Sequence, residues 1–104
     1  MKSESPCNAS CLEHTLGVLG DKWTPLLLHA LNDDARSFCE LETLLDGISP
    51  RTLSQRLEKL VLEGILTKQM YCEHPPRYKY RLTQKGEALR GALHQMSEWG
   101  AQYA

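Results

Sequence analysis

The twenty residues GISPRTLSQRLEKLVLEGIL (47–66) combine a sharp helix start with two opposite faces. Ser49 can cap the first backbone N–H groups, and Pro50 suits the first helical position because no helical N–H is needed there. Apolar residues recur at helical spacing on one side: Leu53, Leu57, Leu60 and Val61. We therefore predict an amphipathic helix over residues 50–63 that packs on a core through its leucines.

The other side of this helix is polar. Arg51, Gln55 and Lys59 are spaced four residues apart, with Thr52 beside them. Arginine can pair with guanine, glutamine with adenine, and threonine with a methyl or phosphate group. A solvated surface helix carries the same pattern, so the flanking segments must decide between the two interpretations.

A short helix is expected before this one, from a cap at Ser37 to about residue 45, followed by a tight turn at Asp46-Gly47. After Gly64 the pattern changes to strand: ILTKQMY (65–71) is rich in strand formers, and YKYRL (78–82) alternates apolar and basic residues. The two prolines of CEHPPR (72–77) predict a protruding, unpaired turn. Helix, turn, helix and basic hairpin together predict a winged helix-turn-helix.

Three further helices complete the expected α+β, mainly helical domain: residues 11–19, residues 22–31 capped by Asp21, and residues 84–103 capped by Thr83. The second is apolar nearly all round, so we expect it at the buried centre, with His29 as a satisfied core residue. The 104 residues suffice for one domain, 1–104, with residues 1–10 as a flexible arm.

Charge is divided unevenly along the chain. Residues 49–85 carry eight basic and three acidic side chains, whereas the remainder carries four basic and ten acidic ones, for a net charge of −1. An ordinary solvated surface with unevenly distributed charges explains this division as well as a binding face does. Such a chain can nevertheless present a cationic face to DNA despite its near-neutral total.

Several classes of protein do not fit the sequence. No apolar run approaches the roughly 18 residues of a membrane span, and the first ten residues lack the apolar segment of a secretory signal. We expect a cytoplasmic protein with no membrane partner and mostly reduced cysteines. The histidines form no cluster with a nucleophile or carboxylate pair, and no phosphate-binding glycine loop is present, so we predict no enzyme and no cofactor.

The predicted partner is double-stranded DNA. The residues expected to contact it through the major groove are Ser49, Arg51, Thr52, Gln55 and Lys59, with Arg56 nearer the DNA backbone. Arg77 and Lys79 of the hairpin should hold phosphates, and His74 at its tip adds charge when protonated. The alternative is a winged-helix protein-interaction module, whose polar stripe would meet an acidic partner.

Three segments resemble the HxlR-type (MarR-like) bacterial transcriptional regulators: LGDKWTPLLLHAL, RSFCELETLLDGISPRTLSQRLEKLVLEGIL and HPPRYKYRLTQKGEALRGALHQMSEWG. The resemblance covers roughly residues 11–100. It implies a recognition helix over residues 50–63. It also implies a homodimer, expected to be a repressor, on a short palindromic operator, with the first and last helices forming the dimer interface.

Physical reasoning also favours a dimer. The last helix has a continuous apolar side, formed by Leu89, Ala92, Leu93, Met96, Trp99 and Tyr103. A core this small is not expected to cover that side together with the leucines of the first helix. We therefore predict residues 84–104 as a dimerisation helix, since a second copy would bury both surfaces. The alternative is that this helix folds back on its own domain.

The cysteines raise a sensing hypothesis. Some HxlR-type regulators sense oxidants or electrophiles through a cysteine ahead of the first helix, and Cys11, with Cys7 as its neighbour, is the nearest match. The family's motif has proline after that cysteine, whereas Leu12 follows here. A thiol at a helix start is expected to be reactive because the dipole favours the thiolate. We expect Cys39, in contrast, to be a small buried residue.

A soft-metal-responsive regulator is the competing hypothesis. Cys7, Cys11 and His14 would face one way on a helix and could bind a soft metal. Three ligands at one chain end, without a C-x-x-C pair, form a weak pattern for zinc. The site prediction therefore names Cys11 and Cys7 as redox-sensing residues and no metal ligands.

Overall fold

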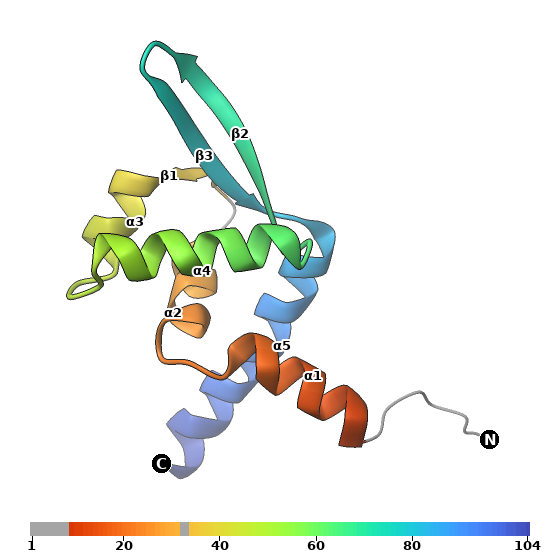
Figure 1. Cartoon of the computed structure of the whole chain (residues 1–104). Helices are drawn as coiled ribbons and strands as arrows, with labels where there is room; N and C mark the ends of the chain where they lie inside the picture. Colours follow the sequence, from red (N-terminus) through yellow and green to blue (C-terminus); the bar gives the residue numbers. More distant parts are fainter. Residues whose placement is uncertain (1–8, 32–33) are drawn as a thin grey trace.

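The computed structural model describes residues 9–31 and 34–104 as a bundle of helices from which a β-hairpin projects (Figure 1). The elements in chain order are α1 (Ala9–Leu19), α2 (Trp23–Ala30), β1 (Arg36–Ser37), α3 (Phe38–Leu44), α4 (Pro50–Leu62), β2 (Leu66–Glu73), β3 (Pro76–Leu82) and α5 (Gln84–Tyr103). The mainly helical α+β architecture with a helix-turn-helix and a wing is as the sequence predicted. Among the described residues, no helix is long and apolar enough to cross a membrane.

The core consists largely of leucine side chains from α2, α3 and α4. Its fully buried members are Leu27, Leu28, Leu31, Leu41, Leu53, Leu57, Leu60, Ile65 and Leu66. Each buried side chain of this size contributes roughly 1.5–3 kcal/mol relative to exposure. The leucine side of α4 therefore faces the core as predicted, and this packing fixes which of its polar residues can face outward.

The helix-turn-helix is held by local caps. The Ser37 hydroxyl accepts a hydrogen bond from the Glu40 N–H at 3.2 Å, and the Glu40 carboxylate accepts one from the Ser37 N–H at 2.8 Å, which forms a capping box. At the start of α4 the Ser49 hydroxyl accepts from the Thr52 N–H at 3.1 Å, with Pro50 at the first position. Both predicted starts are confirmed.

The hairpin differs from its prediction near the prolines. β2 and β3 pair as far as Cys72 with Arg77 and Glu73 with Pro76, so the turn consists only of His74 and Pro75. The prediction that residues 72–77 are unpaired was wrong, because a proline at the first position of a strand withdraws no N–H that the ladder requires. The alternation of β3 is confirmed.

A third strand was not predicted. β1 pairs antiparallel with β3, Arg36 opposite Tyr80 and Ser37 opposite Lys79, and makes a three-stranded sheet in the order β1-β3-β2. The expected two-stranded wing is therefore extended at its base. A strand of two residues is too short to show the alternation of apolar and polar side chains that predicts a strand. Only the tertiary fold brings these residues to the edge of β3.

The junction between wing and α5 explains the spacing of Thr83 and Gly86. The Thr83 hydroxyl donates to the Gly64 carbonyl at 2.6 Å and accepts from the Gly86 N–H at 3.0 Å. A Cβ on Gly86 would collide with the Ile65 carbonyl oxygen. Gly64 ends α4 with φ of 77°, which a residue with a side chain rarely adopts. This junction sets where the hairpin leaves the helices.

Three burial expectations need correction. His29 is exposed on α2, and Cys39 is exposed on α3, whereas both were expected inside. Leu26 on α2 is 45% exposed, so this helix has an open side and is not buried all round. His29 and Leu26 are exposed because α2 packs on α3 through one face and lines a groove with another. In addition, α1 starts at Ala9, inside the predicted arm; the rest of that arm, with Cys7, lies outside the described residues.

Candidate nucleic-acid interface

One side of α4 points away from the rest of the protein. Its exposed residues, named here the outward line, are Arg51, Ser54, Gln55, Glu58 and Leu62. Within residues 9–31 and 34–104, none of these side chains makes a hydrogen bond or ion pair. Leu62 is 83% exposed. The outward line thus offers an arginine, a serine, an amide and a carboxylate with no internal partner.

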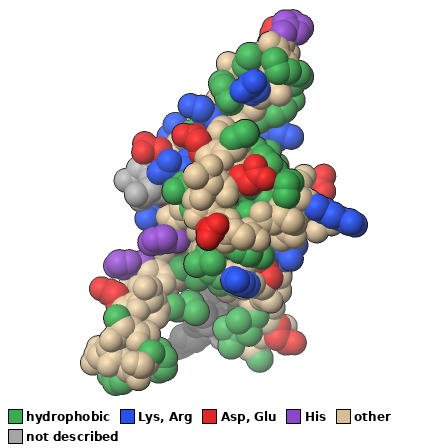
Figure 2. Space-filling view, turned by 90° about the vertical axis from the view of Figure 1, so that its left-hand side faces the viewer, with side chains coloured by type: hydrophobic (Ala, Val, Ile, Leu, Met, Phe, Trp, Pro, Cys, Tyr) green, Lys and Arg blue, Asp and Glu red, His purple; other side chains and the backbone are tan. Residues whose placement is uncertain are grey.

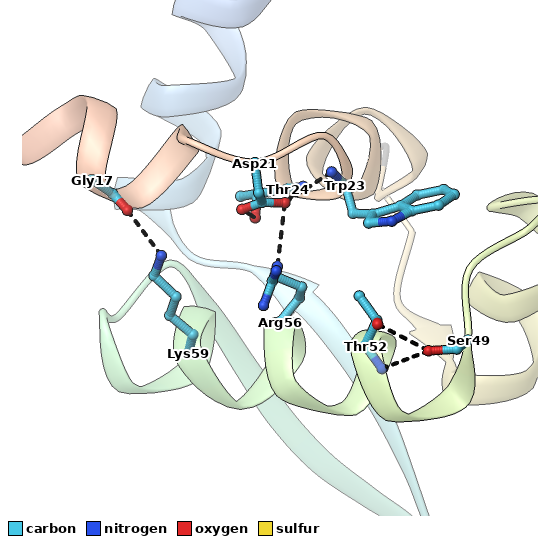
Figure 3. Close-up of polar contacts among 8 residues, drawn as sticks. All are labelled: Gly17, Asp21, Trp23, Thr24, Ser49, Thr52, Arg56 and Lys59. Atoms are coloured by element: carbon cyan, nitrogen blue, oxygen red, sulfur yellow. Dashed lines mark hydrogen bonds and ion pairs between the residues drawn. The ribbon is translucent and has the colours of Figure 1, made fainter.

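The neighbouring side of α4 turns toward α1 and α2 (Figure 3). The Lys59 ammonium donates to the Gly17 carbonyl at 2.9 Å, and the Arg56 Nε lies 3.2 Å from the Asp21 carboxylate. The Ser49 hydroxyl donates to the Thr52 hydroxyl at 2.9 Å. Lys59, Arg56 and Thr52 are half-buried, which contrasts with the outward line. The polar groups of Lys59 and Arg56 hold α4 against the preceding segments, whereas that of Thr52 belongs to the cap of α4 itself.

The predicted DNA-contacting residues of α4 are therefore divided between two sides. Arg51 and Gln55 lie on the outward line and Ser49 is exposed at the helix start, whereas the other three face α1 and α2. Lys59 lies about 80° around the axis from Arg51, which is enough to change its surroundings. Ser54 and Glu58 were not predicted as DNA contacts, although they fall opposite the leucines on the same helical period.

Asp21 links three elements. Its carboxylate accepts hydrogen bonds from the Trp23 and Thr24 N–H groups, each at 2.8 Å, and from the Thr24 hydroxyl at 2.6 Å. Burial acts to raise the pKa of Asp21, but these hydrogen bonds and the charge of Arg56 together lower the pKa below its ordinary value. Asp21, the predicted cap of α2, is thus ionised and also forms an ion pair with Arg56 of α4.

The hairpin presents cationic side chains on both faces. Lys68, Arg77, Lys79 and Arg81 are exposed. The Lys68 ammonium lies 4.3 Å from the centre of the Tyr78 ring, and that of Lys79 lies 5.2 Å from the Tyr71 ring. Such contacts order the long stems without neutralising their charge. The hairpin extends on the side of α4 opposite α1 (Figure 1), and Lys and Arg side chains surround its base (Figure 2).

A second surface feature lies at the other end of the molecule. A groove of about 920 Å³ runs between α1, α2 and α5, and its apolar lining includes Leu16, Leu26, Leu93 and Met96. Leu16 is 53% exposed and Met96 61% exposed. Hydrophobic side chains appear on this lower part of the molecule in the space-filling view (Figure 2). Exposed apolar area of this kind marks a surface that another molecule covers.

The cysteines are distributed over separate elements. Cys11 is exposed on the first turn of α1, Cys39 is exposed on α3, and Cys72 is half-buried in β2 opposite Arg77. Among the described residues, no three His, Cys, Asp or Glu side chains are close enough together to hold a metal ion. The soft-metal hypothesis also required Cys7, outside the described part.

The arrangement of α3, α4 and the hairpin agrees with the comparison to known proteins. The sequence profile of the HxlR-like helix-turn-helix family matches residues 18–104. The chain belongs to the HxlR family. This is a family of helix-turn-helix, DNA-binding transcriptional regulators, so the chain is a transcriptional regulator and not an enzyme.

Individual relatives support this assignment. The chain is 35% identical over 91 residues to the uncharacterized HTH-type transcriptional regulator YvaP of Bacillus subtilis strain 168, covering 88% of this chain and 84% of YvaP. It superimposes with a TM-score of 0.82 on reduced YodB from Bacillus subtilis, at 31% identity and covering 94% and 96% of the two chains. The redox regulator HypR in its reduced form gives a TM-score of 0.82 at 34% identity, covering 88% and 91%.

Proposed function

We propose that this HxlR-family regulator binds a specific, palindromic operator as a homodimer and represses transcription. The observation that carries the proposal is the outward line of α4, whose polar side chains are exposed and have no internal partner among the described residues, together with the cationic hairpin that follows α4 and projects from the helices (Figure 1). An α-helix of this kind fits the major groove, and a basic hairpin beside it can follow the DNA backbone.

In this proposal, Arg51 and Gln55 contact base edges, because both are exposed and carry groups that recognise guanine and adenine. Ser49 and Thr52 lie at the N-terminus of α4, where hydroxyl and backbone N–H groups suit a phosphate. Lys59 and Arg56 are already engaged with Gly17 and Asp21. Their remaining donors serve the DNA backbone.

Arg77 and Lys79 of the hairpin serve the adjacent phosphates. Both are exposed on β3, and Lys79 is ordered by the Tyr71 ring. His74 lies in the exposed turn at the hairpin tip. Contacts of this kind add affinity on every sequence, so the hairpin strengthens binding without selecting the operator.

The groove between α1, α2 and α5 supports dimerisation. The partner's α5 is the proposed occupant, because α5 continues beyond the core and carries Trp99 and Tyr103, 66% and 65% exposed. Their rings are in contact at a centroid distance of 5.4 Å, tilted by 38°, and form one apolar unit. Covering these residues with a second copy would also place two α4 helices in a symmetric pair, as a palindromic operator requires.

Oxidant or electrophile sensing is the finer part of the proposal. YodB has been solved after diamide treatment and with bound quinone, and HypR in reduced and oxidised forms. Cys11 is exposed on α1, the helix to which Lys59 of α4 is hydrogen-bonded. Modification of Cys11 would alter a helix that contacts both the groove and the recognition helix.

A mobility-shift titration against genomic fragments tests operator binding. The wild-type protein is expected to retain a small set of fragments that share a palindrome. Arg51→Ala and Gln55→Ala should each weaken that binding by about 1–3 kcal/mol and relax the preference at one position per half-site. Equal retention of all fragments at physiological salt would refute specific recognition, whereas retention of none would favour a protein-interaction module.

The sensing proposal is tested on the same fragments with diamide. Diamide is expected to release the wild-type protein from its operator and to leave Cys11→Ser bound. Cys39→Ser is the matched control, since Cys39 is also exposed but lies on α3. Release of Cys11→Ser to the same extent as wild type would remove Cys11 from the mechanism and leave DNA binding intact.

A further inference from the structure

Glu58 is the one acidic member of the outward line. It lies one turn beyond Ser54 and one turn before Leu62, on the side of α4 that the core leaves open. Residues three or four apart on a helix are surface neighbours, with Cβ atoms about 5–6 Å apart. If Gln55 reaches a base edge, the Glu58 carboxylate is therefore in or beside the same groove.

An exposed glutamate on a helix can pair with a cation three or four residues away. Glu58 has no such partner, because the residues four positions before and after it, Ser54 and Leu62, are uncharged. The nearby cations of α4 are turned aside: Arg56 faces Asp21 and Lys59 faces Gly17. The carboxylate thus has no cationic partner on α4, on a surface that is otherwise suited to DNA.

A carboxylate near DNA phosphates is repelled unless it accepts a hydrogen bond. In the major groove only cytosine N4 and adenine N6 present donors, and adenine adds the N7 acceptor beside its donor, which repels the second carboxylate oxygen. Cytosine is therefore the base that a glutamate favours. The other bases present acceptors or a methyl group toward it.

We propose that Glu58 selects a cytosine in each half-site of the operator. This inference rests on the proposed function. Arg51 and Glu58 are seven residues apart, or about 10 Å along the helix axis. This distance corresponds to about three base pairs, so the cytosine lies within about three positions of the guanine bound by Arg51.

Selection of bound sequences from a random DNA library tests the inference. Wild type and Glu58→Ala are selected in parallel, and the base preference is compared at each position. Glu58→Ala is expected to lose at least about fivefold discrimination for cytosine at one position per half-site, while the other positions keep theirs. Glu87→Ala, which removes an exposed acid of α5, is the matched control and should leave every position unchanged.

Glu58→Gln gives a readout that a folding defect cannot imitate. It keeps the shape of the side chain but offers an amide that pairs with adenine N6 and N7, so the preference at that position should move from cytosine toward adenine. An exposed helix position tolerates both variants, and circular dichroism would verify the helix content.

Other outcomes overturn the inference. If Glu58→Ala binds all sequences more tightly with unchanged base preferences, the carboxylate only repels phosphates. If wild type selects a motif and Glu58→Ala selects the same one, the inference is wrong and the proposed function stands. If wild type selects no motif, the proposed function fails and the inference with it.

Discussion

The Lys59 ammonium of α4 donates a hydrogen bond of 2.9 Å to the Gly17 carbonyl of α1, across 42 residues of sequence. Near the end of α1 that carbonyl belongs to the negative pole of the helix dipole, which favours a cation. The contact joins the helix that carries Cys11 and lines the apolar groove to the helix that carries the outward line. The hydrogen bond therefore ties the position of α4 to that of α1.

Lys59→Met should loosen α1 from α4. We expect a loss of about 0.5–1.5 kcal/mol in the free energy of unfolding, because the Gly17 carbonyl loses its charged donor. Hydrogen exchange of the α1 amides should rise more than that of the core. Lys68→Met is the control, since the Lys68 ammonium lies over the Tyr78 ring on the hairpin. Equal hydrogen exchange of the α1 amides in both variants would show that the hydrogen bond from Lys59 to Gly17 does not hold α1 on α4.

Asp21→Asn should make the protein less sensitive to acid. Because the folded-state pKa of Asp21 lies below its ordinary value of 3.8, its carboxylate stabilises the fold above about pH 5, and this contribution is lost as the pH falls through the folded pKa. Wild type should exceed Asp21→Asn in unfolding free energy at pH 7, and the two should converge toward pH 3. Urea titrations at both pH values measure this; a constant difference would show that charge is not involved.

Lys79→Ala should weaken binding on operator and random DNA alike. If Lys79 neutralises one phosphate, the slope of log affinity against log salt should decrease in magnitude by about 0.9 per subunit. Lys22→Ala is the matched control, because Lys22 is exposed beside Trp23, away from the hairpin. An unchanged slope for Lys79→Ala would count against the hairpin as a phosphate contact.

Met96→Glu should convert the proposed dimer into a monomer. A second copy that covers the groove would have to remove the new charge from water, which is strongly unfavourable. Because Met96 is 61% exposed in the single chain, the fold should persist. Sedimentation velocity measures the change, with Leu44→Glu, at a 50% exposed site on α3, as control. A dimer that survives Met96→Glu would exclude this surface as the interface.

Helices with strong local signals were predicted well. Ser37, Ser49 and Thr83 each accept a hydrogen bond from the backbone N–H three residues later, as expected of caps. A cap and the residue it serves are one turn apart, so the physical cause is visible in a short window of sequence. The same holds for β3, whose alternation places Tyr80 inside and Lys79 outside.

The errors concern residues whose surroundings come from distant segments. Pro76 enters β3 because β2 is opposite it, and Ser37 joins the sheet because β3 passes beside it. His29 and Cys39 are exposed because no segment within residues 9–31 and 34–104 covers their sides of α2 and α3. Apolar content alone did not reveal which side of a short helix stays open.

The sequence by itself determined the order of helix, turn, helix and hairpin and the presence of Arg51, Gln55 and Lys59 on one helix. Caps and periodicity act within a few residues, and that information is local. Only the tertiary structure decided that Arg51 and Gln55 face outward while Lys59 is held by Gly17. That division depends on where the end of α1 packs, and packing depends on the whole core at once.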